Sequence, residues 1–119
     1  MDIHELMEYN KRLFAIQEQK ADMLNVLKDV SKEYGKAKGN VRDKLREHFK
    51  EAQDNTKKSA GIEILELYVC NKCPEIAQDY KTYIELDSER KFLIQAVESL
   101  NQDESAIQSE MKYQGIAGG

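Results

Sequence analysis

The sequence has few residues that interrupt a helix. Its 119 residues include one proline, Pro74, and six glycines, and it contains no tryptophan. The glycines lie at positions 35, 39, 61, 115, 118 and 119, so long stretches have nothing to break a helix. This scarcity favours a small number of long helices over a fold rich in turns.

Long apolar runs are also missing. The longest, such as Phe92-Leu93-Ile94, are about three residues, whereas a membrane-spanning helix needs about 20. The N-terminus carries Asp2 and Glu5 where a secretory signal would have a basic stretch and an apolar block. We therefore expect a cytoplasmic protein without membrane contact.

The residues from which most catalytic and metal sites are built are scarce. There are two histidines, His4 and His48, and no glycine-rich phosphate loop. The two cysteines, Cys70 and Cys73, form a C-x-x-C pair, which is half of a zinc site or a redox dithiol. No second ligand pair accompanies them, and the βαβ setting of a dithiol is missing, so packing as small apolar side chains is favoured. We expect no cofactor and no metal, with Cys70 and Cys73 as the weak alternative.

Apolar residues recur at steps of three and four along most of the chain, which indicates amphipathic helices. The first predicted helix covers 3–34, with a polar gap around Asn10 and Gln17, and ends at the two glycines of 35–39. Asn40 would cap a second helix over 41–53. Residues 62–70 also suit a strand, but no partner strand exists elsewhere, so a helix over 61–71 is favoured. Pro74 suits the first position of a helix over 74–113.

These lengths predict an all-α fold, an elongated helical hairpin or bundle in a single domain over 1–119. A helix of about 40 residues is about 60 Å long, whereas a compact chain of this size has a radius of gyration of about 13–14 Å. The helix over 3–34 can cover only part of the C-terminal one. Apolar positions would then remain for another subunit, so we expect a homo-oligomer.

The net charge of −4 is unevenly distributed, and the middle of the chain is basic. Residues 1–31 carry −2, residues 32–58 carry +4 and residues 59–119 carry −6. The cations of the middle segment are Lys32, Lys36, Lys38, Arg42, Lys44, Arg46, Lys50, Lys57 and Lys58. Such a cluster is a candidate track for a phosphate backbone, because the local field governs contact with a polyanion. A solvated helix face with internal ion pairs is the alternative. Few aromatics lie nearby, so any binding should be independent of base sequence.

The C-terminal helix has a Val97-Glu-Ser-Leu100 step, then Ile107-Gln108-Ser109 with Lys112, and a glycine-ending tail. From Tyr80 onward it resembles the small helical recombination mediators of bacteriophages, of the UvsY type. That resemblance implies an oligomer that binds single-stranded DNA weakly and loads a RecA-like recombinase onto strand coated by a single-strand binding protein. It implies DNA contact by the basic segment, assembly by the long helix, and partner contact by an acidic outer face that includes Glu85, Asp87, Glu89, Asp103 and Glu104.

Two other classes remain open. A scaffold-like or chaperone-like assembly protein would use the same apolar stripes without nucleic acid, and a small inhibitor or adaptor would bind one protein through its acidic face. An enzyme is not expected, because the sequence has no nucleophile and base set and no metal constellation.

Overall fold

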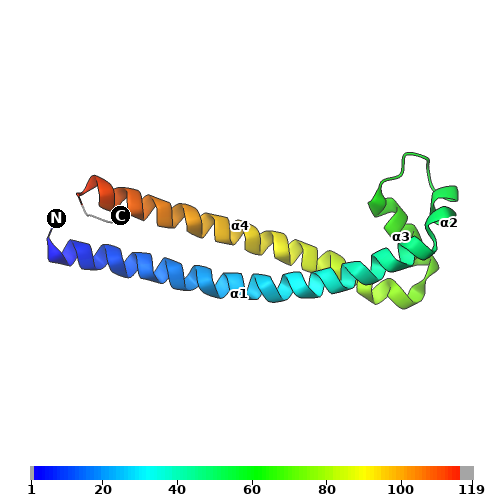
Figure 1. Cartoon of the computed structure of the whole chain (residues 1–119), viewed down its shortest axis with the longest axis horizontal. Helices are drawn as coiled ribbons and strands as arrows, with labels where there is room; N and C mark the ends of the chain where they lie inside the picture. Colours follow the sequence, from blue (N-terminus) through cyan, green and yellow to red (C-terminus); the bar gives the residue numbers. More distant parts are fainter. Residues whose placement is uncertain (1, 116–119) are drawn as a thin grey trace. The chain divides into compact units, whose positions relative to one another are not determined.

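The computed structural model describes residues 2–115, and every regular element in that range is helical. The long helices are α1 (Ile3–Glu47) and α4 (Ala77–Tyr113). Between them lie α2 (Phe49–Asp54), α3 (Ile62–Lys72) and the 3₁₀ turn η1 (Pro74–Ile76) (Figure 1). The all-α prediction is confirmed.

The first predicted helix end is wrong. We expected helix 3–34 to stop at Gly35 and Gly39, but α1 continues through both, and neither has a positive φ. Glycine in a helix costs only about 1 kcal/mol relative to alanine. Ala37 and Val41 lie on the buried side of the same stretch, and their packing outweighs that cost. Asn40, the predicted cap, lies inside the helix, and its amide donates to Asp79 Oδ2 at 3.4 Å.

The second predicted helix, 41–53, is consequently divided. Its first part belongs to α1, and the remainder forms α2 after a break at His48, whose φ of −114° and ψ of 18° are not helical. Local periodicity continues across this position. The pattern of apolar residues therefore does not reveal the break.

The helices of the C-terminal half lie close to their predicted ranges. The ambiguous stretch is the helix α3, one residue later at each end than the predicted 61–71, and Gly61 is its extended N-cap. Pro74 does begin a helical segment, but its first turn is the 3₁₀ helix η1, and α4 proper starts at Ala77. The end at Tyr113 is as predicted.

The chain divides into two compact units that share both long helices. Unit 1 takes in the chain up to Lys28 and from Arg90 onward, and unit 2 is Asp29–Glu89. Because α1 and α4 each supply residues to both units, this division does not test the prediction of a single domain.

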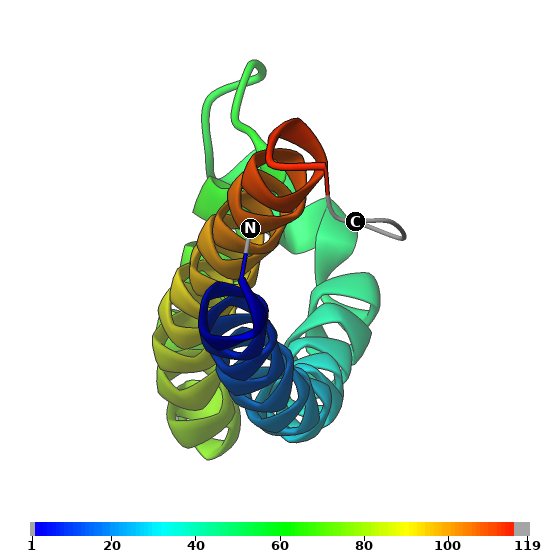
Figure 2. The same ribbon diagram turned by 90° about the vertical axis from the view of Figure 1, so that its left-hand side faces the viewer.

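Unit 1 is an antiparallel hairpin of α1 and α4, which lie side by side in both views (Figure 1 and Figure 2). Tyr9 donates to Glu110 Oε1 at 2.6 Å, and Lys20 contacts Glu104 Oε2 at 3.0 Å. The partly or fully buried positions alternate in steps of three and four, as in a coiled-coil seam. On α1 they are Leu6, Tyr9, Leu13, Ile16, Lys20, Met23 and Leu27. On α4 the seam follows Arg90, Leu93, Val97, Leu100, Glu104, Ile107 and Met111, and Ile94, Ala96 and Gln108 are partly buried beside it.

Unit 2 has a core of its own, closed by five helical segments. Val41, Val69 and Ala52 are completely buried, from α1, α3 and α2 respectively. The other members of this core are Ala37, Leu45, Leu65, Cys70, Cys73, Ile76 and Tyr83. Side chains of the short helices α2 and α3 therefore share one core with side chains of α1, η1 and α4.

No helix among residues 2–115 has a stretch long and apolar enough to span a bilayer.

Candidate nucleic-acid-binding surface

All nine cations of the predicted DNA-binding segment belong to unit 2. Six of them lie on α1, one on α2 and two in the segment between α2 and α3. They are Lys32, Lys36, Lys38, Arg42, Lys44, Arg46, Lys50, Lys57 and Lys58. The structure separates this set into side chains that contact carboxylates or a ring of the same unit and side chains that extend into solvent.

Arg42 is partly exposed, and its side chain serves the fold by pairing with a buried carboxylate. Its Nε lies 2.9 Å from Glu66 Oε1, and Glu66 is only 1% exposed. A buried carboxylate requires a cation and hydrogen-bond donors, because its desolvation is costly. Arg42 therefore neutralises Glu66 from α3, and substituting it would disturb the fold before it affected any DNA contact.

Lys44 and Arg46 are also paired. Lys44 Nζ lies 3.1 Å from Glu47 and 3.5 Å from Glu75, and the hydrogen bond to Glu47 raises the pKa of Lys44. Arg46 lies 2.7 Å from Asp43, with both side chains mostly exposed. An exposed pair of this kind is weak, so Arg46 could exchange its carboxylate for a phosphate more easily than Lys44, which two carboxylates hold.

Lys38 lies over the ring of Tyr34. Its Nζ is 5.5 Å from the ring centroid, a cation–π contact within the same turn of α1. Tyr34 in turn packs on Tyr83 with ring centroids 5.5 Å apart. This aromatic ring is therefore occupied by neighbours and is a poor platform for a base.

The remaining five cations are exposed, and none forms a salt bridge within the described part of the chain. They are Lys32, Lys36, Lys50, Lys57 and Lys58. Unit 2 as a whole has eleven Lys and Arg against thirteen Asp and Glu, a net charge of −2. Attraction for a polyanion would therefore depend on local groups of exposed cations such as these five, and not on the charge of the whole unit.

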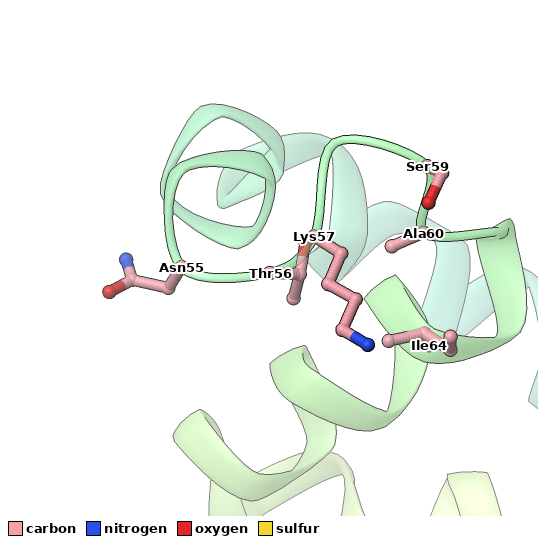
Figure 3. A pocket seen from close by; sticks show the side chains of 6 residues that line it. All are labelled: Asn55, Thr56, Lys57, Ser59, Ala60 and Ile64. Carbon is pink, nitrogen blue, oxygen red and sulfur yellow. The ribbon is translucent and has the colours of Figure 1, made fainter.

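A hollow of about 550 Å³ lies beside the segment that carries Lys57. Figure 3 shows the Lys57 side chain extending across it toward Ile64 at the start of α3. The hollow is lined by Asn55, Thr56, Lys57, Ser59, Ala60 and Ile64. Side chains with hydroxyl and ammonium groups thus line this hollow, whereas the Asn55 amide points away from Lys57 and Ile64 in Figure 3.

Glu51 on α2 contacts two side chains of α3 and also His48 at the break before α2, which the sequence did not reveal. Its carboxylate accepts from Lys72 at 2.8 Å and from the Tyr68 hydroxyl at 3.5 Å, and its other oxygen lies 3.4 Å from His48 Nδ1. The hydrogen bond from Lys72 holds the pKa of Glu51 below its ordinary value of 4.5. Glu51 and Lys72 are 21 residues apart, so no local pattern in the sequence predicts that they pair.

Cys70 and Cys73 are both buried in the core of unit 2, with free thiols. Burial raises the pKa of Cys70 to about 11, so the thiol is protonated at neutral pH and is a poor nucleophile or metal ligand. Among residues 2–115, no three His, Cys, Asp or Glu side chains come together as a metal site would require. His4 is exposed in unit 1, and His48 contacts Glu51.

The predicted acidic outer face of α4 needs one correction. Glu104 lies in the seam of unit 1 and contacts Lys20, so it does not belong to an outer face. Glu85, Glu89 and Asp103 are exposed as expected, and Asp87 is partly buried.

No family model, no curated protein and no solved structure matches this chain.

Proposed function

We propose that this chain is a non-enzymatic accessory protein that binds single-stranded DNA weakly, through its phosphates, at the exposed lysines of unit 2. The observation that carries the proposal is the set of five lysines without a bound carboxylate, Lys32, Lys36, Lys50, Lys57 and Lys58. Phosphate contacts of this kind give binding that depends on salt and not on base sequence.

The resemblance of the C-terminal helix to phage recombination mediators supports a more specific role. Under that proposal the DNA-bound protein acts beside a RecA-like recombinase and a single-strand binding protein in a host cytoplasm. The exposed carboxylates Glu85, Glu89 and Asp103 are the side chains we assign to contact with those proteins.

The test uses a labelled oligo-thymidine strand and fluorescence anisotropy at low and moderate salt. Arg42 and Lys44 are unsuitable for charge reversal, because both pair with carboxylates of the fold. We instead expect the double variant Lys57→Glu and Lys58→Glu to weaken binding and to reduce the slope of log K against log salt by about 1.4, since each single-strand phosphate contact contributes about 0.7.

The matched control is the double variant Lys28→Glu and Lys112→Glu. It makes the same charge change at exposed lysines of unit 1. We expect it to retain most of the affinity. Equal losses in both double variants would mean that only net charge matters, and no binding by the unmodified chain at low salt would reject the DNA proposal.

The second candidate is an assembly or adaptor protein that acts through protein contacts alone. It is favoured by the large apolar side chains on the surface of unit 1, where Phe14 is 65% exposed and Phe92 is 69% exposed. A chain that fails to bind DNA but associates through these side chains would belong to this class.

A further inference from the structure

A line of large apolar side chains runs along α1 in unit 1, away from the seam with α4. Ile3, Met7 and Phe14 are 68%, 61% and 65% exposed, and Leu24 is 45% exposed. Residues that recur at steps of three and four lie along one side of a helix. Several large apolar side chains exposed along one side of a helix are typical of an interaction surface.

The spacing of this line is that of a second coiled-coil seam. Positions 3, 7, 10, 14, 17, 21 and 24 alternate steps of four and three, and they interleave with the positions that face α4. Asn10 and Gln17 are its two polar members, and Ala21 is exposed on the same line. We call positions 3–24 of this set the outer seam. Within residues 2–115, no other element of unit 1 covers it.

Two charges flank the outer seam on the side away from α4. Lys11 and Glu18 follow Asn10 and Gln17 at the same heptad position, and both are exposed without an ion pair in the described chain. In an antiparallel coiled coil, such positions face their equivalents on the other helix. A second copy would therefore bring Lys11 against Glu18 twice, once on each side of a two-fold axis.

The same arrangement fits the apolar side chains. When Lys11 faces Glu18 of the second copy, Met7 lies beside its Leu24 and the two Phe14 rings lie close to the two-fold axis. In a parallel arrangement, the residue next to Lys11 would be Leu6 of the other copy, which offers no opposite charge. Charge complementarity thus selects one partner and one direction.

We propose that the outer seam is the contact between two copies of this chain, which pair antiparallel about an axis near Phe14. This goes beyond the proposed function, because it needs no nucleic acid and names the surface and the register of self-association. It also explains why α1 exposes large apolar side chains in unit 1. A second α1 covers the side of the helix that α4 leaves open.

Sedimentation equilibrium of the full chain over a wide concentration range tests the contact. The unmodified chain should approach twice its mass of 13.8 kDa as the concentration rises. Phe14→Lys should shift the chain to monomer, because it places two like charges near the axis. Phe92→Lys is the matched control, an equally exposed phenylalanine on α4 outside the outer seam, and should leave the association unchanged.

Two charge variants test the direction. Lys11→Glu places glutamate against Glu18 in its own homodimer, and Glu18→Lys places lysine against Lys11, so each alone should associate more weakly than the unmodified chain. Mixed together, they restore two opposite-charge pairs and should form a heterodimer. Circular dichroism would confirm that each variant keeps its helix content, as expected for exposed positions.

Three results would overturn the proposal. A monomeric mass at every concentration would leave the outer seam to a different protein. Equal association of Phe14→Lys and Phe92→Lys would place the contact elsewhere. Undiminished homodimers of both charge variants would exclude the antiparallel register.

Discussion

Units 1 and 2 draw on the same two long helices, yet they bury their apolar side chains to different depths. In unit 2, α2 and α3 add further layers, so Val41 and Val69 reach zero exposure. In unit 1, none of the described residues of α1 up to Lys28 is fully buried, and its buried side chains come from α4 alone. Two helices have only one face each to share, so a hairpin leaves its outer sides open.

The ion pairs of the two units also differ in how deeply they are buried. Unit 2 encloses a carboxylate, Glu66, that is 1% exposed and paired with Arg42. The pair inside the seam of unit 1, Lys20 and Glu104, keeps 24% and 19% of its side-chain surface in solvent. Unit 2 therefore encloses a core of its own, although Ile64 and Leu67 remain about half exposed on its surface. In unit 1 the most exposed apolar side chains, Ile3, Phe14 and Phe92, lie on the outer sides of a two-helix hairpin.

The largest expected effect is at the buried ion pair of unit 2. Arg42→Ala leaves the buried Glu66 carboxylate without its cation, so the free energy of unfolding should fall by about 3 kcal/mol, the lower end of the range for a buried pair because Arg42 is itself 32% exposed. Urea denaturation at neutral pH would measure this. Arg46→Ala removes an exposed pair with Asp43 and should change stability by about 0.5 kcal/mol or less. Similar losses in both variants would show that Glu66 does not depend on Arg42.

A leucine truncation in each unit compares the two packing depths directly. Leu45→Ala, at a position 2% exposed in unit 2, should cost about 3 kcal/mol. Leu13→Ala, at a partly buried position in unit 1, should cost about 1 kcal/mol, because less apolar surface leaves water there. The same denaturation experiment measures both. A larger loss for Leu13→Ala would invert the comparison.

The polar pair in the seam of unit 1 should have a smaller effect. Lys20→Leu leaves Glu104 without its cation and should lower stability by about 1 kcal/mol, since both side chains retain contact with water. The double variant Lys20→Leu and Glu104→Leu should equal or exceed the unmodified chain, because it continues the apolar seam. A double variant less stable than the single one would mean that the pair itself stabilises the hairpin.

The smallest expected effect is a pH dependence in unit 2. The pKa of Glu51 is lowered below 4.5 in the folded chain, mainly by Lys72. The ionised Glu51 carboxylate therefore contributes fully to folding stability above about pH 4.5, and this contribution is lost as the pH falls through its lowered pKa. The melting temperature of Glu51→Gln should fall less than that of the unmodified chain between neutral pH and about pH 3. Glu33→Gln, at an exposed position on α1, is the control and should follow the unmodified chain.

Much of the fold follows from the sequence, because helix formation depends on local spacing. Pro74 marks the start of the C-terminal helical segment, and the apolar residues of 62–70 form a helix as expected. The break predicted at Gly35 and Gly39 was wrong, since Ala37 and Val41 pack into the core of unit 2 from the same stretch. Tertiary packing there outweighs a local preference that the sequence does show.

The candidate surface was less predictable, because ion pairs join residues that are distant in sequence. Nothing in the sequence pairs Arg42 with Glu66, 24 residues away, or Lys44 with Glu75. Both look like the other cations of the segment until the fold is known. Likewise, α1 has two apolar lines with heptad spacing, and the sequence does not specify which of them α4 covers.

Hydrogen–deuterium exchange of the full chain at increasing protein concentration tests the central claim most directly, because it reports on each unit separately. If two copies pair through the outer seam of unit 1, amide protection within residues 3–24 should rise with concentration while that of α3 in unit 2 stays constant. Protection that is independent of concentration in both units would contradict the account.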